Sequence, residues 1–290
     1  MENPVKKIAA INDLSGIGRS SLTAMISIVS YMGIQVCPVP TSVLSTQTSG
    51  YKDYTFVDLT ESMEGTLNHW INEDIKFNCI FSGFLGSEKQ ADIIIDFINN
   101  KHNKDCLVIV DPVMGDNGEL YDTVDHKITS KMKELVYHAD IILPNVFEAY
   151  HLLDRNGEEE ITEEQAKKLM KELSQKGPTK VVITGAKIKG ENNKIVTFCY
   201  DKNEDKAYKI VRDYIPVYYP GTGDAFASVF AGSILSGNKL PVAVLKASKF
   251  VLDGIMESEK YDYPTREGIL IEKVLNTLGE NSGSENIVEI

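Results

Sequence analysis

Pro216–Phe230 reads PVYYPGTGDAFASVF, which places Gly221, Thr222, Gly223 and Asp224 directly before an apolar run of small residues that predicts a helix. The glycines allow several main-chain N–H groups to point at one spot at the helix N-terminus, where the helix dipole adds partial positive charge. The segment is therefore a candidate anion site. Its carboxylate is either a favourable first-turn acid or a base that accepts a proton from a substrate hydroxyl as that oxygen attacks a phosphoryl group. The segment alone leaves both interpretations open.

Before this stretch, up to residue 184, short apolar runs alternate with amphipathic segments. Near-continuous apolar strands that alternate with helices are typical of a parallel sheet covered on both faces. We therefore predict an α/β protein with three layers, α/β/α, and a central, mostly parallel sheet. The predicted strands cover 5–11, 36–40, 79–82, 107–111, 141–143 and 181–184, and the predicted helices cover 20–32, 61–71, 88–100, 130–138, 147–153 and 162–174.

After residue 184 the pattern changes. KIVTFCYD (194–201) and KAYKIVRDY (206–214) flank a polar KNED turn and predict an antiparallel hairpin. Further helices are expected at 223–236, 241–258 and roughly 266–277. No internal repeat, low-complexity tract or linker interrupts the chain, so we predict one domain over residues 1–290 with a frayed tail over 279–290. In such a sheet, ligands gather outside the carboxyl ends of the strands.

The chain is strongly acidic, with a formal net charge of -12. Such a chain repels phosphate backbones, so no nucleic-acid partner is expected, although local main-chain dipoles can still hold a small anionic ligand. No apolar run approaches the roughly 20 residues of a membrane span, and the N-terminus lacks a long apolar signal core, so we expect a cytoplasmic protein with no membrane partner. The four cysteines are widely spaced and are expected to be buried, reduced thiols.

Hydroxyl, amide and carboxyl side chains follow the first two predicted strands. Asp13 and Ser15 come directly after the first strand, where a turn with a helix cap is the alternative to a binding site. Gln47 and Thr48 lie in the loop Thr41–Tyr51, TSVLSTQTSGY. This loop suits hydrogen bonding to a small polar ring, and an ordinary solvated loop is the alternative.

Acidic and amide side chains also follow the later strands. Asp111 and Asp116 lie on one tight loop, DPVMGD, where the two carboxylates repel each other unless a cation is near; Mg²⁺ with bound phosphate is the natural partner, and a plain Asx turn is the alternative. Asn145 and Glu148 stand at the start of a predicted helix, as either a capping box or a water-mediated Mg²⁺ site. Thr184 could approach a nucleotide phosphate or form a turn. None of these signals decides alone, but their coincidence at successive strand ends supports a single ligand site.

Four motifs, DPVMGD, LPNVFEA, VVITG and GTGDAF, together resemble the ribokinase-like superfamily, over residues 8–251. Within it, the chain resembles the vitamin kinases, which are pyridoxal/pyridoxamine kinase and the hydroxymethylpyrimidine kinase of thiamin synthesis. The resemblance implies a ribokinase-like kinase with ATP and Mg²⁺ as co-substrates, which phosphorylates a hydroxymethyl group on a small ring and forms a homodimer. It leaves open whether a monovalent cation is also required.

Carried over position by position, the resemblance implies a role for each candidate site residue. Asp224 is the base, and the anion hole is formed by Gly221, Thr222 and Gly223. The residues that face ATP, the phosphates and Mg²⁺ are Asp111, Asp116, Asn145, Glu148 and Thr184, of which Asp111, Asp116 and Glu148 face the metal, partly through water. The positions similar to those lining the vitamin pocket are Asp13, Ser15, Gln47, Thr48 and Phe84.

Two departures from the family pattern concern the acceptor pocket. Pyridoxal kinases usually carry Asn-His-Thr-Gly where this chain has TQTSGY, so Gln47 stands in place of the histidine. The first loop, NDLSGIG, is closer to the pyrimidine-kinase pattern, whereas SGFLGS and DPVMGDNG favour pyridoxal kinase. We expect a B6 vitamer (pyridoxal, pyridoxamine or pyridoxine) as the acceptor. Hydroxymethylpyrimidine or its phosphate is the alternative substrate, and a non-catalytic ligand sensor is an alternative of a different class.

Overall fold

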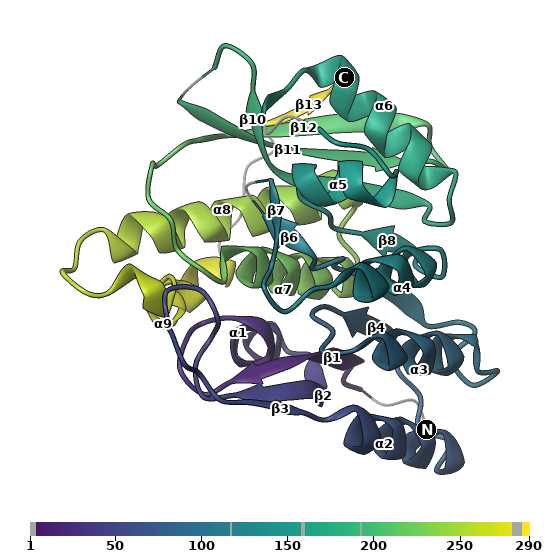
Figure 1. Ribbon diagram of the computed structural model, residues 1–290. Helices are drawn as coiled ribbons and strands as arrows, with labels where there is room; N and C mark the ends of the chain where they lie inside the picture. The colour runs from purple at the N-terminus through teal and green to yellow at the C-terminus, as the bar shows by residue number, and fades with distance from the viewer. Residues whose placement is uncertain (1–3, 117, 158–159, 192, 280–285) are drawn as a thin grey trace.

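The computed structural model of the protein describes residues 4–116, 118–157, 160–191, 193–279 and 286–290 (Figure 1). Its central feature is an 11-stranded sheet in the order β13-β12-β11-β10-β8-β5-β4-β1-β2-β3, with β9 paired to β10. The strands from β10 through β2 are parallel, and β11, β12, β13 and β3 extend the two ends antiparallel. The strands are β1 (Lys7–Ser15), β2 (Gln35–Leu44), β3 (Phe56–Asp58), β4 (Cys79–Ser82), β5 (Leu107–Val110), β8 (Ile141–Ile142), β9 (Glu160–Ile161), β10 (Lys180–Ile188), β11 (Lys194–Asp201), β12 (Lys206–Asp213) and β13 (Ile287–Glu289), with a separate β6–β7 pair (Gly115–Asp116 and Glu119–Leu120).

Helices cover both faces of the sheet (Figure 1). One face is covered by α2 (Thr60–Asn72), α3 (Glu88–Asn99), α4 (His126–Val136), α5 (Val146–Leu152) and α6 (Glu163–Ser174). The other face is covered by α1 (Ser21–Tyr31), α7 (Thr222–Leu235), α8 (Leu240–Ser258) and α9 (Ile271–Val274), with the 3-10 turns η1 (Thr265–Glu267) and η2 (Leu275–Gly279) nearby.

The sheet separates two hydrophobic cores, because successive residues of a strand point to opposite faces. In β1, Ala9 and Ile11 join the core under α2 to α6, whereas Ile8 and Ala10 join the core under α1, α7 and α8. The central strands are thus buried on both faces, which explains why their sequences are continuously apolar rather than alternating. The predicted three-layer fold with a mostly parallel sheet is confirmed.

The predicted hairpin is also confirmed, because β11 and β12 pair antiparallel along their whole length. The helix predicted at 130–138 begins earlier than expected. Its N-cap is Asp125, whose side chain accepts hydrogen bonds from the N–H groups of Lys127 and Ile128, so α4 starts at His126. Capping by a carboxylate satisfies N–H groups that the helix itself leaves unpaired.

Two expectations at the C-terminal end need correction. The helix expected over roughly 266–277 is interrupted at Gly268, whose φ of +83° is incompatible with a right-handed helix. The tail expected to be frayed is ordered at Ile287–Glu289, which form β13 on the edge of β12, with Ile287 packed against the core under α8. Residues 280–285 of that tail lie outside the described residues.

All four cysteines are free; Cys79, Cys106 and Cys199 are buried as expected, whereas Cys37 is only half-buried. Among the helices that the structure describes, none has the length and apolar character needed to cross a membrane.

Candidate active site

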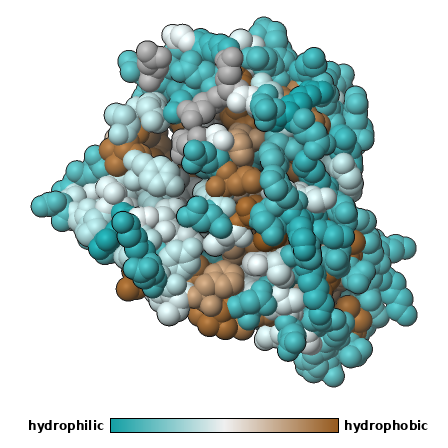
Figure 2. Space-filling model, in the orientation of Figure 1, coloured by the Kyte–Doolittle hydropathy of each residue, from teal (hydrophilic) through white to brown (hydrophobic). Residues whose placement is uncertain are grey.

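One cleft collects the polar residues predicted at the strand ends. It has a volume of about 590 Å³, which is within the range of small-molecule sites. It lies where the carboxyl ends of β1, β4, β5 and β8 meet the start of α7, as expected for a ligand site in a parallel sheet. In the view of Figure 2, hydrophobic atoms are visible along the middle of this side of the molecule, below a mostly hydrophilic upper surface. All the predicted site residues line the cleft: Asp13, Ser15, Gln47, Thr48, Phe84, Asp111, Asp116, Asn145, Glu148, Thr184, Gly221, Thr222, Gly223 and Asp224.

The start of α7 has a backbone that only glycine adopts easily. Gly221 is the N-cap of α7 and has a φ of +84°, and a Cβ atom at this position would lie 2.2 Å from the main-chain oxygen of Arg19. A glycine cap has no side chain to accept the first N–H groups of the helix, which also have no acceptor within the helix. Since Thr222 and Gly223 line the cleft, these N–H groups lie beside it and are a candidate anion site.

Asp224, in the first turn of α7, is a partly buried carboxylate whose pKa is raised to about 7. The main cause is desolvation by burial, and the neighbouring Asp13 raises the pKa further. Hydrogen bonds to its carboxylate from the Ser21 main chain and the Asn12 side chain act in the opposite direction. A carboxylate with a pKa near neutrality is well matched to accepting a proton at neutral pH.

Asn145 and Glu148 form a complete capping box at the start of α5. The Asn145 side chain accepts a hydrogen bond from the Glu148 N–H at 2.9 Å, and Glu148 Oε2 accepts from the Asn145 N–H at 2.9 Å. Glu148 Oε1 accepts from the Met114 N–H at 2.9 Å, and Asn145 Nδ2 donates to the Gly115 main-chain oxygen at 2.8 Å. The pair therefore attaches the loop that contains Asp116 to the start of α5. The capping-box interpretation is confirmed for these two residues.

The acidic side chains around this loop repel one another. Burial raises the pKa of Glu148 to about 8 against the hydrogen bonds from the main chain, and Asp116 raises it further. Burial also raises the pKa of Asp111 well above its ordinary value, with added repulsion from Glu148 and Asp224. A cation near these groups would relieve the repulsion.

The carboxylates of the cleft fit a metal ion that keeps most of its water and phosphate ligands. Within the described residues, no group of three or more His, Cys, Asp or Glu side chains converges in a way that could hold a metal ion. Mg²⁺ is usually held by one or two carboxylates, with waters and substrate phosphates completing its shell. Asp111 and Asp116 both line the cleft and can supply these carboxylates. Glu148 already accepts main-chain hydrogen bonds through both oxygens, so it fits a role through water better than direct ligation.

Thr184 lies in β10 next to Asn145, with which it forms an isolated parallel bridge. Its N–H donates to the Pro144 main-chain oxygen at 2.9 Å. Asn145, which follows β8, and Thr184, which lies within the neighbouring strand β10, are therefore brought together at one edge of the cleft. The adjacent Gly185 has a φ of +63°, and a Cβ there would have open space around it.

The end of the cleft near β1 is rich in polar atoms. Ser15 Oγ donates to Asp13 at 3.0 Å, and burial raises the pKa of that carboxyl group above its ordinary value. The Gln47 side-chain amide donates to the Arg266 main-chain oxygen, while its Oε1 is buried without a hydrogen-bond partner within the described residues. Ser20, which also lines the cleft, has a buried Oγ that likewise lacks a hydrogen-bond partner within the described residues. Buried polar atoms are normally paired, so a polar ligand is expected here.

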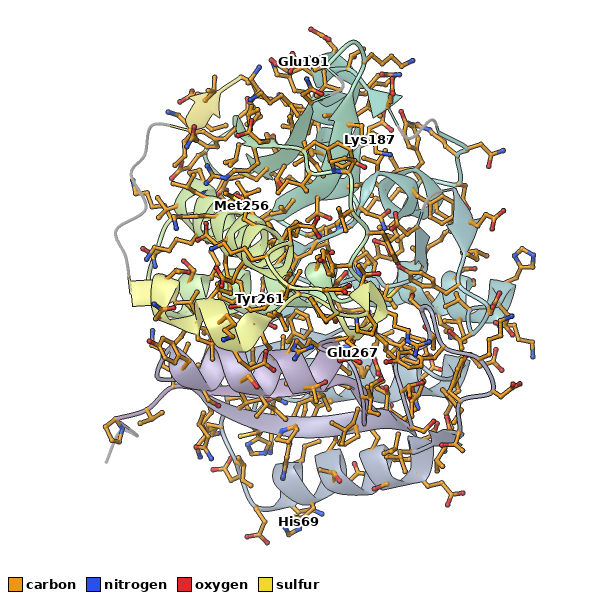
Figure 3. All side chains as sticks on the ribbon, turned by 90° about the vertical axis from the view of Figure 1, so that its left-hand side faces the viewer. His69, Lys187, Glu191, Met256, Tyr261 and Glu267 are labelled. Carbon is orange, nitrogen blue, oxygen red and sulfur yellow. The ribbon has the colours of Figure 1, made fainter. Side chains whose placement is uncertain are left out.

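The structure adds cleft residues that the sequence did not single out. Ser20 and Ser21 come from the start of α1, and Arg212 and Lys187 come from β12 and β10. Asn12, in β1, does not itself line the cleft but donates a hydrogen bond to Asp224, which does. Lys187 and Glu267 are labelled in Figure 3, where Lys187 lies on the sheet and Glu267 lies beside the start of α1. The sequence signal for Asn12 was its place next to Asp13 at a strand end, but the strand pattern alone did not separate it from a core position.

Comparison with known proteins gives one family match. The family model described as phosphomethylpyrimidine kinase matches residues 18–266. A crystal structure of a "putative phosphomethylpyrimidine kinase" from Bacteroides thetaiotaomicron, in an orthorhombic form with pyridoxal, is 42% identical to this chain. The match covers 99% of this chain and 100% of that chain with a TM-score of 0.95.

Two pyridoxal kinases are also similar to this chain. The crystal structure of pyridoxal kinase from Lactobacillus plantarum is 26% identical, with a TM-score of 0.85, and the match covers 95% of this chain and 97% of that chain. Pyridoxal kinase from Arabidopsis thaliana is 31% identical over 200 residues, which are 67% of this chain and 60% of the relative. The match thus spans less than two thirds of that relative's length.

Proposed function

Because the chain belongs to the phosphomethylpyrimidine kinase family, we propose that it is an ATP-dependent kinase that phosphorylates the hydroxymethyl group of a B6 vitamer. The observation that carries this proposal is the position of Asp224. Its carboxylate, with a pKa near neutrality, stands on the first turn of α7 beside the N–H groups of the anion site, in the same cleft as Asp111 and Asp116.

Asp224 is the general base of the proposed reaction. It accepts the proton of the substrate hydroxyl while the hydroxyl oxygen forms a bond to the γ-phosphorus of ATP and the bond from that phosphorus to the bridging oxygen breaks, so that ADP leaves. The N–H groups at Gly221, Thr222 and Gly223 stabilise the charge on the transferred phosphoryl group. Positioning and electrostatics supply most of the rate enhancement in such reactions, and base assistance adds about 10²–10⁴-fold.

Mg²⁺ would be held at the Asp111 and Asp116 end of the cleft, with Glu148 acting through water. A bound Mg²⁺ neutralises charge on the phosphates of the nucleotide. In this chain, Asn145 and Thr184 lie beside these acids and supply polar contacts to ATP. The nucleotide base has apolar surface available from Val251 and other residues of α8 that line the cleft.

The acceptor occupies the end of the cleft around Asp13, Gln47 and Phe84. A substituted pyridine with hydroxyl and hydroxymethyl groups offers hydrogen-bond donors to the buried Gln47 Oε1 and Ser20 Oγ, and its ring can contact Phe84. The related structure that contains pyridoxal supports this choice of acceptor. Ser15, which bonds to Asp13, and Thr48 complete the proposed pocket.

Hydroxymethylpyrimidine or its phosphate is the second candidate acceptor, since the family model carries the name of that activity. The experiment that separates the candidates measures ADP release with pyridoxal, pyridoxamine, pyridoxine and hydroxymethylpyrimidine at equal concentrations. We expect the highest kcat/KM with a B6 vitamer. A higher kcat/KM with the pyrimidine would overturn the choice of acceptor, and no ADP release with any of the four would favour a ligand sensor.

The raised pKa of Asp224 predicts the pH dependence of the reaction. The base must be ionised, so kcat/KM is expected to rise with pH below about 7 and to level off above it. The Asp13→Asn variant removes the neighbouring charge that raises this pKa, and its acid limb should therefore lie at lower pH than that of the wild type. If the acid limb of the pH profile lies at the same pH in Asp13→Asn and in the wild type, Asp13 does not raise the pKa of Asp224.

A homodimer is proposed on the basis of charge. The chain repels copies of itself, with a formal net charge of -12, yet residues 20–51 contain no Asp, Glu, Lys, Arg or His. These residues form α1 and β2, beside the edge strand β3, where Val43 and Val57 pair across the two strands with 38% and 54% of their surface exposed. Figure 2 shows hydrophobic atoms gathered in its lower part, where Figure 1 has β2 and β3. Two copies can meet here without bringing like charges together.

The Val57→Glu variant is expected to shift the mass measured by light scattering from dimer to monomer, because it places a charge in this contact. Val288→Glu is the matched control, since Val288 is an exposed valine (44%) on β13, the strand at the opposite edge of the sheet. A dimer that persists in Val57→Glu would exclude this surface, and a monomeric wild type would exclude the dimer.

A further inference from the structure

Asn12 joins three separate parts of the cleft through one buried side chain. Only 2% of its surface is exposed. Its Oδ1 accepts hydrogen bonds from the N–H of Phe84 at 2.8 Å and from its neighbour Asp13 at 3.0 Å. Its Nδ2 donates to Asp224 Oδ1 at 3.4 Å. One amide therefore connects the end of β1, the loop after β4 and the first turn of α7.

The space around this amide is closed. Gly83 lies so close that a Cβ atom on it would be 2.6 Å from Asn12 Nδ2 and 2.7 Å from the Asn12 side-chain carbon Cγ. Since both Asn12 Oδ1 contacts are donated by main-chain N–H groups, the oxygen and the nitrogen of the amide cannot exchange places without losing them. The N–H that points at Asp224 is thus fixed by the loop around it.

Ser21 provides a second contact to the same carboxylate. It is the first residue of α1 and has a φ of +48°, in the left-handed region that non-glycine residues rarely adopt. In this conformation its main-chain N–H favours the ionised form of Asp224 and its side chain favours the ionised form of Asp13, so that each lowers the pKa of its neighbouring carboxyl group. A strained residue that makes two contacts to site carboxylates is a sign that the local geometry serves the site.

We propose that Asn12 is a positioning residue for Asp224, which holds the carboxylate in a single orientation, together with the Ser21 N–H, so that it can face the substrate hydroxyl. The inference rests on the proposed function, in which Asp224 is the base. Asn12 does not touch the substrate in this proposal. Its effect on the reaction passes through the orientation of Asp224, and a carboxylate that rotates freely spends less time aligned with the proton that it removes.

The informative variant is Asn12→Asp. It keeps the acceptor oxygen for the Phe84 and Asp13 N–H groups, so the loop after β4 is retained, but it replaces the donor that faces Asp224 by a second carboxyl oxygen. That oxygen either repels Asp224 or shares a proton with it, and both outcomes weaken the base. Asn12→Leu removes both functions of the amide at similar size.

We expect Asn12→Asp to lower kcat at least about 10-fold while the KM for the acceptor changes less than about twofold, because the contact to the base affects the reaction step. The control is Asn103→Asp, at a buried amide (4% exposed) that donates to the Phe97 main-chain oxygen at 2.8 Å away from the cleft. It should retain the wild-type kcat even if its melting temperature falls.

A double-mutant cycle distinguishes this inference from the proposed function. In an Asp224→Asn background, Asn12→Asp and Asn12→Leu should each change the residual kcat less than about twofold, since the carboxylate that they orient is gone. Full additivity of the two changes, or a wild-type kcat in Asn12→Asp, would overturn the positioning role alone. Unchanged turnover in Asp224→Asn itself would instead remove the base, and with it the proposed mechanism.

Discussion

Replacement of Asp224 by asparagine is expected to lower kcat by at least about 10²-fold, the lower end of what a general base contributes. Asparagine has nearly the same size and can accept a hydrogen bond from the Ser21 N–H, but it cannot take up the proton of the substrate hydroxyl. Steady-state ADP release measures the loss, and calorimetric titration with ATP analogues should give a dissociation constant close to that of the wild type. A large loss of nucleotide affinity would mean that Asp224 acts in binding.

The control is Asp201→Asn, at a buried aspartate (8% exposed) that accepts a hydrogen bond from the Asn203 N–H at 2.9 Å and does not line the cleft. This variant should keep the wild-type kcat. Turnover of Asp224→Asn within about threefold of the wild type would exclude a general base at this position.

The second large effect is expected for Gly221→Ala. At a φ of +84° an alanine lowers the free energy of unfolding by about 1–2 kcal/mol. In addition, its Cβ would lie 2.2 Å from the Arg19 main-chain oxygen. This oxygen belongs to the backbone, so it cannot move aside as the end of a flexible side chain could. The start of α7 must shift, so the N–H groups of the anion site leave their positions. Loss of a single aligned donor in comparable sites lowers kcat about 10²–10³-fold, and we expect a loss of at least 10²-fold here.

Gly33→Ala separates this effect from general strain. Gly33 follows α1 with a φ of +81°, and a Cβ there meets nothing within 4 Å. The same chemical change thus carries the backbone cost without the collision, at a distance from the cleft. Gly33→Ala should melt at a lower temperature but retain its kcat. Equal losses of kcat in the two variants would argue that the anion site does not depend on the position of the α7 start.

The parts of the fold that the sequence predicted well are those buried on both faces. β4, β5 and the first part of β10 (Val181–Ile183) are apolar at nearly every position, and this signal does not depend on the rest of the chain. By contrast, β3 and β13 are short edge strands with mostly exposed side chains. Their formation depends on an available neighbour, which local sequence does not encode.

In the candidate site, too, residues with a local sequence signal were predicted and residues that depend on distant contacts were not. The residues at the strand ends and at the start of α7 were predicted, because a turn, a carboxylate and a helix start are local features. Asn12 was not, because its partner Asp224 is 212 residues away and the contact exists only through the fold. The left-handed backbone of Ser21 has no signal in the sequence either, since serine is not selected for that conformation. For Asn145 and Glu148, local sequence allowed two interpretations; the capping box is confirmed by the hydrogen bonds, and the water-mediated Mg²⁺ site stays a prediction.

The crowding of acids around the cleft has a consequence for folding. Burial raises the pKa of Asp13, Asp111, Glu148 and Asp224, so these groups bind protons more tightly in the folded state than in the unfolded chain. Their contribution to stability is complete below the unfolded pKa of about 4 and is lost as pH rises through about 7 for Asp224 and about 8 for Glu148. Burial and mutual repulsion of these carboxylates therefore lower the stability of the free protein at the pH where Asp224 is ionised. The proposed Mg²⁺ would relieve this repulsion, so its binding would also stabilise the folded state.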